Sequence, residues 1–172
     1  GKYMNPYYHY VEQLFTDNYK HIKDANYKEY LKMNNPKDNE LTFDRPYRRL
    51  WGLDTFNYGK LYNFIDVSLV PLQQNLFTAC KSELKLIEAG FMKKAVIVSN
   101  VRPYDELADE FNSIRIEPNR NGIDWYVQMR NLIKDRNRVE DLGEALYESV
   151  KVKYHIDTVN VERKQIFDRL CE

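Results

Sequence analysis

Residues 66–99 constrain the fold more than any other part of the chain. The segment begins with a short run of β-forming apolar residues at 67–70, which Pro71 ends, and it closes with a second run at 95–98. Short apolar runs between turn signals are typical of strands that are buried on both faces. The order is therefore strand, loop, one helix and strand, and a connection of this length predicts two parallel strands joined by a right-handed crossover.

The helix between these two strands is expected to be amphipathic. At about 100° per residue, Leu84, Ile87 and Phe91 share one face, which predicts that this face packs on the sheet. Gly90 lies near the helix end, where it would let the helix approach a strand closely. Ligands of such sheets collect beyond the carboxyl ends of the strands and at helix N-termini. Residues 72–82 are therefore expected to meet an anionic ligand.

Length and charge narrow the class of protein. A chain of 172 residues is long enough for one domain with a real core. Its 26 Lys and Arg residues balance its 26 Asp and Glu residues, which argues against broad electrostatic binding of nucleic acid. The longest apolar runs are far shorter than the roughly 20 residues that cross a bilayer, and no leader sequence is recognisable. We expect a soluble domain that binds no nucleic acid and has no transmembrane segment.

The cysteine and histidine content gives no sign of a metal site. Cys80 and Cys171 are the only cysteines, and neither they nor the three histidines have the spacing of zinc ligands or of a disulfide framework. We therefore expect no metal, and a reducing, cytoplasmic compartment is favoured.

The segments that flank the central unit are predicted to be mostly helical. Residues 1–53 show weak helical patterning and no strand-forming run, which indicates a mostly helical N-terminal segment, and residues 54–172 form the α/β domain. Within that domain a short helix is expected at 58–64, and a last helix at 156–170.

Between these helices the sequence predicts further elements. Pro103 is well placed to open a helix, and Ile114 and Ile116 alternate as in a short strand. From residue 124 onward the chain is helical. Two apolar stripes are expected on these helices, namely Trp125, Met129, Leu132 and Ile133, then Val139, Leu142, Ala145, Leu146 and Val150.

A small basic cluster, Arg45, Arg48 and Arg49, precedes the α/β domain. Guanidinium groups offer paired donors to phosphate oxygens, so the cluster could clamp a diphosphate. The alternative is that these arginines are surface charges that pair with Asp44 and Asp54. The general behaviour of exposed charges favours this alternative.

Three segments are familiar when they are read together. Residues 58–72 read YGKLYNFIDVSLVPL, residues 81–100 read KSELKLIEAGFMKKAVIVSN, and residues 141–156 read DLGEALYESVKVKYHI. In order and spacing they resemble the C-terminal half of GT-B glycosyltransferases of the group 1 (family 4) kind, over about residues 54–170. The resemblance implies a Rossmann-like parallel sheet flanked by helices. It also implies that this half binds a nucleotide diphosphate sugar as substrate, with no separate cofactor, while an N-terminal half binds the acceptor.

The resemblance assigns roles to individual positions. Glu88 matches the second glutamate of the family's E-x7-E motif, which holds the donor ribose, and a carboxylate can accept from two vicinal hydroxyls. The first glutamate of that motif falls at Cys80, which cannot do the same work. Ser82, Glu83 and Leu84 match the segment whose backbone amides meet the diphosphate, in agreement with the expectation for a helix N-terminus.

Lys81 is the best local candidate for a phosphate contact. Lys81 and Lys85 are like charges one turn apart, which is mildly unfavourable unless an anion or Glu88 offsets them. The alternative is a solvated charged face in which Lys85 pairs with Glu88. The family's Arg and Lys pair, which neutralises the leaving diphosphate, lies upstream of the matched segment, and no motif places it here. The catalytic residues are therefore not identified.

The sequence thus predicts the donor-binding half of a retaining glycosyltransferase of glycan biosynthesis. We expect it to be a fragment of a longer cytoplasmic enzyme, with the acceptor domain elsewhere in the same chain. If the full-length enzyme acts at a membrane, we expect it to be a peripheral protein there. One alternative is a different enzyme or regulator on a doubly wound sheet, such as a receiver domain, which would need acidic residues clustered at strand ends. Another is a non-catalytic module that keeps the fold but has lost the donor site, for which Cys80 is the reason.

Overall fold

The computed structural model describes residues 54–118 and 122–171. The chain divides into two compact units, residues 1–58 and residues 59–172, and the fold described below is that of the second unit. The helices predicted within residues 1–53, and the cluster of Arg45, Arg48 and Arg49, lie outside the described residues.

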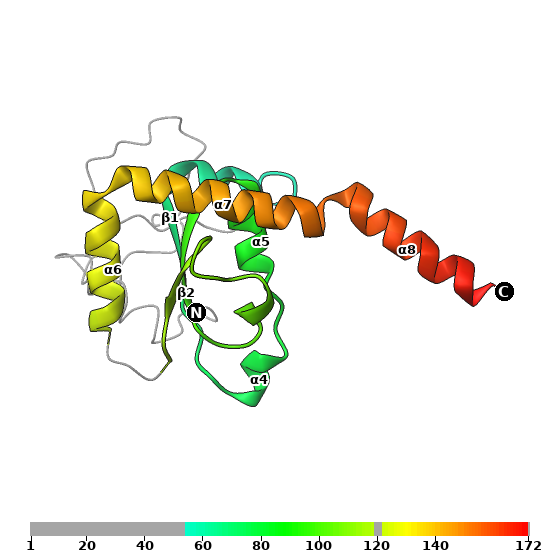
Figure 1. Cartoon of the computed structure of the whole chain (residues 1–172), viewed down its shortest axis with the longest axis horizontal. Helices are drawn as coiled ribbons and strands as arrows, with labels where there is room; N and C mark the ends of the chain where they lie inside the picture. The colour runs from blue at the N-terminus through cyan, green and yellow to red at the C-terminus, as the bar shows by residue number, and fades with distance from the viewer. Residues whose placement is uncertain (1–53, 119–121, 172) are drawn as a thin grey trace, which may run out of the picture. The chain divides into compact units, whose positions relative to one another are not determined.

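A three-stranded parallel sheet forms the centre of this unit (Figure 1). Its strands are β1 (Val67–Val70), β2 (Ala95–Ser99) and β3 (Ile114–Ile116), in the order β1-β2-β3. Val67 lies opposite Ala95, and Ile97 lies opposite Ile114. The predicted parallel pair is therefore confirmed, and helices flank the sheet as expected for an α/β Rossmann-like fold.

The two strands of the central unit differ in burial. All five residues of β2 are buried, as predicted. Leu69 of β1, however, is 45% exposed, so the prediction that both strands are buried on two faces is wrong for β1. The reason is its position, because in the described sheet β1 pairs with β2 alone.

The crossover between β1 and β2 contains two helices where one was predicted. The first, α4 (Leu76–Ala79), is a single turn inside the expected loop. It is closed by a capping box in which the Asn75 side chain accepts from the Thr78 N–H at 2.9 Å, while the Thr78 hydroxyl accepts from the Asn75 N–H at 3.1 Å. The second helix, α5 (Leu84–Phe91), is the predicted one.

The buried face of α5 is not the predicted face. Leu86, Ala89 and Gly90 are buried, whereas Leu84 and Phe91 are 52% and 38% exposed. The helix turns its small residues inward because a second helix, α7 (Arg136–Tyr154), packs against it.

Gly90 permits a close approach to α7 rather than to a strand. A Cβ atom added at Gly90 would lie 2.8 Å from both Val150 methyl groups and 3.1 Å from Leu146 Cγ. The close approach predicted for this glycine is therefore correct, but the element that approaches is a helix.

The other elements agree with the predicted order. A 3-10 helix, η1 (Tyr58–Phe64), precedes β1, and a second one, η2 (Tyr104–Glu106), follows Pro103. The chain ends in three helices, which are α6 (Ile123–Lys134), α7 and α8 (Ile156–Leu170).

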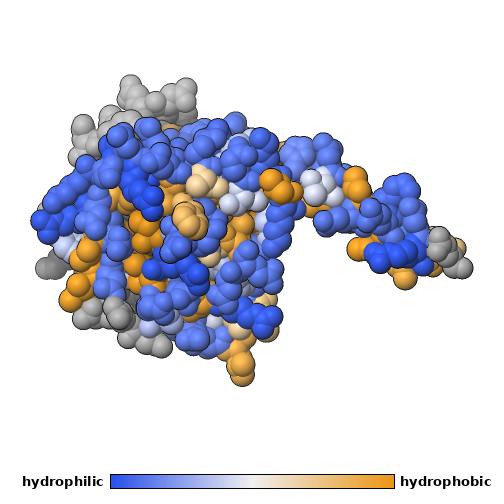
Figure 2. All heavy atoms as spheres, in the orientation of Figure 1, coloured by the Kyte–Doolittle hydropathy of each residue, from blue (hydrophilic) through white to orange (hydrophobic). Residues whose placement is uncertain are grey.

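The helices differ in how they join the core. Leu132 of α6 and Leu142 of α7 pack in one cluster with Ala95, Ile97 and Ile116 of the sheet. Ile133, which belongs to the predicted apolar stripe of α6, is exposed. In α8 no residue is buried, and Figure 1 shows this helix extending away from the sheet. Figure 2 shows apolar surface on α8 and at the end of α4, where Leu76 and Phe77 are exposed.

Among the described residues, no helix is both long enough and apolar enough to cross a bilayer.

Candidate functional site

The carboxyl ends of the three strands meet at one edge of the sheet, which we call the carboxyl edge. Two hydrogen bonds tie the segments that leave it. The Leu72 N–H donates to Ser99 Oγ at 2.8 Å, and the Asn100 N–H donates to the Ile116 carbonyl at 2.7 Å. These bonds fix the positions at which the chain turns away from each strand, so this edge is a well-defined surface for a ligand.

The N-terminus of α5 follows the loop that leaves β1. Glu83 is the N-cap residue, but its side chain makes no capping hydrogen bond. The Leu86 N–H already bonds to the Glu83 carbonyl at 2.9 Å. The Leu84 amide comes first in the helix, where helix geometry supplies no acceptor. The helix therefore presents backbone donors and the positive end of its dipole to an anion.

The Glu83 carboxylate is directed instead toward the end of α7. The Tyr154 hydroxyl donates to Glu83 Oε1, and Lys153 Nζ lies 3.8 Å from the same oxygen. The Glu83 side chain is only 18% exposed. Burial raises the pKa of Tyr154, and the hydrogen bond to Glu83 raises it further. Glu83 thus links α5 to α7 through its side chain. Only its backbone is left for the role that the resemblance predicted, which is contact with the diphosphate.

Glu88 lies one turn further along α5. Its Oε2 atom accepts from the Tyr62 hydroxyl at 2.8 Å and from Lys85 Nζ at 2.9 Å. Its side chain is 21% exposed. The structure therefore contains the local ion pair with Lys85 that was the alternative to a ribose contact, and it adds a buried tyrosine from η1. Sequence reasoning missed Tyr62 because it is 26 residues away and no local pattern connects the two positions.

Cys80 and Lys81 lie between α4 and α5. Cys80 is the C-cap residue of α4, and its thiol is free and exposed. Lys81 Nζ lies 5.4 Å from the centre of the Phe77 ring, within the range of a cation–π contact. Lys81 and Ser82 are both exposed. Of the predicted residues from Cys80 to Leu84, all except Glu83 are therefore exposed on the approach to α5.

A cleft of about 350 Å³ lies at the carboxyl edge. We call it the carboxyl-edge cleft, and its lining residues are Pro71, Leu72, Gln73, Gln74, Ser99, Glu117, Pro118 and Trp125. Leu72, Gln73 and Gln74 belong to the loop 72–82 that was expected to meet a ligand, whereas the individually predicted residues, Cys80 to Leu84 and Glu88, do not line the cleft. Trp125 comes from α6, which Figure 1 shows on the other side of the sheet from α5. The structure thus has two separate groups of residues near this edge.

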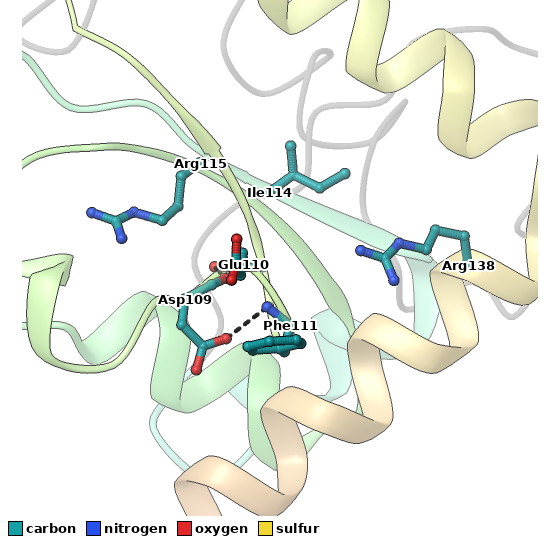
Figure 3. Close-up of a pocket in the computed structure, with 7 residues that line it drawn as sticks. Asp109, Glu110, Phe111, Ile114, Arg115 and Arg138 are labelled. Atoms are coloured by element: carbon teal, nitrogen blue, oxygen red, sulfur yellow. Dashed lines mark hydrogen bonds between the residues drawn. The ribbon is translucent and has the colours of Figure 1, made fainter.

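A larger hollow, of about 500 Å³, lies near the opposite end of β3. In Figure 3, Arg138 reaches from α7 toward Phe111, and Arg115 extends the other way. Arg115 donates to Asn100 Oδ1, and Asp109 accepts from the Phe111 N–H at 2.8 Å. This hollow begins where β3 begins, which is the end of a parallel sheet that ligands seldom use. The candidate site is therefore the carboxyl edge.

The described residues contain no group of His, Cys, Asp or Glu side chains that could hold a metal ion. Asp66, the acidic residue beside β1, precedes the strand and pairs with Arg136 at 3.1 Å. It therefore lies at the wrong end of the sheet for a receiver-type site.

Comparison with known proteins bears on the fold. No protein-family model and no curated protein sequence matches this chain. A glycosyltransferase from Rickettsia africae ESF-5 matches 72% of this chain and 32% of its own, with a TM-score of 0.56 and 16% identity. Sucrose-phosphate synthase from Thermosynechococcus elongatus matches 64% of this chain and 26% of its own, with a TM-score of 0.52 and 18% identity. This unit therefore has an α/β Rossmann-like fold of the glycosyltransferase type.

Proposed function

We propose that this chain is the donor-binding part of a retaining glycosyltransferase, which transfers a sugar from a nucleotide diphosphate sugar to an acceptor. The observation that carries the proposal is the uncapped N-terminus of α5, with Lys81 beside it, on a fold of the glycosyltransferase type. Helix N-termini are established sites for phosphate groups.

In this proposal the diphosphate lies at the first amides of α5. These donors, the helix dipole and the Lys81 ammonium group would stabilise the negative charge that grows on the diphosphate as it leaves the sugar. The work of this part of the enzyme is then positioning and charge stabilisation. The residues that neutralise the diphosphate from the other side, and those that bind the acceptor, are assigned to other parts of a longer chain.

Glu88 is proposed to bind the ribose. Both of its hydrogen bonds to the protein reach Oε2, so Oε1 is the atom assigned to the sugar hydroxyls. Tyr62 and Lys85 would then hold the carboxylate in place. Because Cys80 cannot accept from a hydroxyl as a glutamate does, donor binding on that side is expected to differ from that of the family. The cytoplasmic location remains a proposal, which two free cysteines favour.

The test is a titration with UDP, GDP and ADP followed by amide NMR signals. We expect shifts at residues 81–84 and at Glu88. Lys81→Ala should weaken binding by about tenfold, since it removes a charge-assisted contact. Lys164→Ala, an exposed lysine on α8, is the matched control and should bind normally. Shifts confined to other surfaces would contradict the donor site.

A second titration examines Glu88 itself. Glu88→Gln keeps the size of the side chain but removes its charge, and we expect about tenfold weaker binding of the nucleoside diphosphate with little change in urea midpoint. Equal binding would remove Glu88 from the site.

One observation favours a second candidate function. The exposed thiol of Cys80 stands where the family has a carboxylate, which is what a non-catalytic module that has lost its donor site would show. If none of the three nucleotides shifts any amide signal, this second candidate replaces the first. If Cys80→Glu then restores binding, loss of that one carboxylate is the cause.

A further inference from the structure

The carboxyl-edge cleft has a chemistry that the proposed donor site does not use. It combines one aromatic ring, two primary amides, a carboxylate and a hydroxyl within a volume of about 350 Å³. Small-molecule sites are typically concave, with aromatic walls and a few polar groups that fix orientation. From this combination we propose that the carboxyl-edge cleft binds the ring of a neutral sugar.

Trp125 supplies the aromatic wall. It lies near the start of α6 and packs against the buried cluster of Ala95, Ile97 and Leu132. This packing restricts the indole while part of the residue lines the cleft. The face of an aromatic ring carries partial negative charge, and the C–H groups on one face of a sugar ring carry partial positive charge. A pyranose can therefore stack on this wall with its hydroxyl groups at the rim.

Glu117 supplies an acceptor that is hydrogen-bonded to a neighbouring side chain. Its Oε1 atom accepts from the Asn100 side-chain amide, and Asn100 Oδ1 accepts from the Arg115 guanidinium group. This chain of three side chains holds the carboxylate immediately after β3. A carboxylate accepts from two hydroxyls at once, and Gln73 and Gln74 add both donors and acceptors. The polar groups thus match the alternating hydroxyls of a sugar.

The charge of the described lining residues favours a neutral ligand over a phosphate. Among the described lining residues there is no lysine, arginine or histidine, and Glu117 is the one charged side chain. A nucleotide bound here would bring its phosphates near this carboxylate, which is unfavourable. The cleft therefore differs from the start of α5, and the inference does not rest on the donor assignment.

The test uses the 172-residue chain with methyl glycosides of glucose, galactose and mannose. The readout is the indole N–H signal of Trp125, which Trp51→Phe distinguishes from the other tryptophan. We expect at least one glycoside to shift this signal and to show saturation transfer. Uridine, guanosine and adenosine are the comparison ligands and should leave the signal unchanged.

Variants distinguish sugar binding in the cleft from a general effect of substitution on the protein. Glu117→Gln keeps the shape of the side chain, and we expect about tenfold weaker sugar binding because a charged hydrogen-bond acceptor is lost. Gln74→Ala should weaken binding by about threefold. Gln165→Ala, a glutamine on α8, is the matched control and should bind normally. Urea unfolding of each variant checks that it is folded.

Three results would overturn the inference. They are no effect of any glycoside on Trp125, an effect of nucleosides alone, and unchanged sugar binding by Glu117→Gln. The donor proposal is read from different signals, the amides of residues 81–84 and 88 with a nucleoside diphosphate. A silent cleft with responsive amides therefore contradicts only the sugar site, and the opposite result contradicts only the donor site.

Discussion

Gly143 sits where the backbone of α7 nearly touches the turn before β2. An added Cβ would lie 2.4 Å from the Lys93 carbonyl oxygen, which cannot move without shifting the chain. We expect Gly143→Ala to lower the free energy of unfolding by about 3 kcal/mol, and Gly90→Ala by about 1 to 2 kcal/mol, because overpacking strains the core. Gly59→Ala is the control, since its added Cβ would meet no atom within 4 Å. Urea unfolding would rank the three variants, and equal midpoints would contradict the close approach.

Tyr154 gives the unfolding equilibrium a dependence on alkaline pH. Burial, and then the hydrogen bond to Glu83, raise its pKa above the ordinary value of a tyrosine, although Lys153 lowers it in part. The folded chain therefore keeps this proton to higher pH than the unfolded chain, and the stabilisation is complete below the unfolded pKa and is lost as the pH rises through the folded one. Urea midpoints between about pH 9 and pH 11 should fall less steeply for Tyr154→Phe than for the native chain. Tyr126→Phe, an exposed tyrosine on α6, serves as the control.

At the scale of elements, α8 contributes little to the stability of the core. None of its residues is buried, and its exposed side chains include Ile166, Phe167 and Leu170. We expect that ending the chain after His155 lowers the helical signal in circular dichroism but leaves the urea midpoint of the remaining unit unchanged. Most stability comes from burial of apolar area, which this helix does not provide. A lower midpoint would show that the helix packs against the rest of the chain in solution.

Elements with a strong local signal could be predicted from the sequence. The apolar runs at 67–70 and 95–98 became β1 and β2, and the alternation of Ile114 and Ile116 became β3. The ends of α8 also agree with the prediction. These features depend on spacing within a few residues, which is the information that a single sequence carries.

Features set by packing could not be predicted in the same way. The inward face of α5 contains Ala89 and Gly90. The small size of Gly90 is needed because Val150 of α7 lies against it. Leu69 looked like a core residue, but exposure depends on how many strands lie beside β1. Likewise the Tyr62 to Glu88 and Tyr154 to Glu83 bonds join residues that are far apart in sequence.

The candidate site was predicted only in part. The sequence pointed to the carboxyl edge of the sheet and to the approach to α5. It did not reveal the carboxyl-edge cleft, because Gln73 and Trp125 come from segments that no local pattern connects. Glu88 and Lys81 remain predictions that binding experiments have to test.

At the scale of the whole molecule, charge balance affects solubility. The 26 acidic and 26 basic residues give a formal net charge of zero at pH 7. Proteins associate most readily where their net charge vanishes. We expect the solubility of this 172-residue chain to be lowest near neutral pH and to rise on either side. Precipitation assays over a pH series at low salt would show this minimum, and a flat profile would contradict it.

The junction between α7 and α8 determines how far the end of the chain reaches. His155 alone separates the two helices, as C-cap of one and N-cap of the other, with φ −61° and ψ 138°. The 15 residues of α8 span about 22 Å. A change of about 20° at this one residue would move the far end by about 8 Å for a helix of that length. The two backbone dihedral angles of His155 therefore determine the direction of α8. They also determine which positions Phe167 and Leu170 can reach.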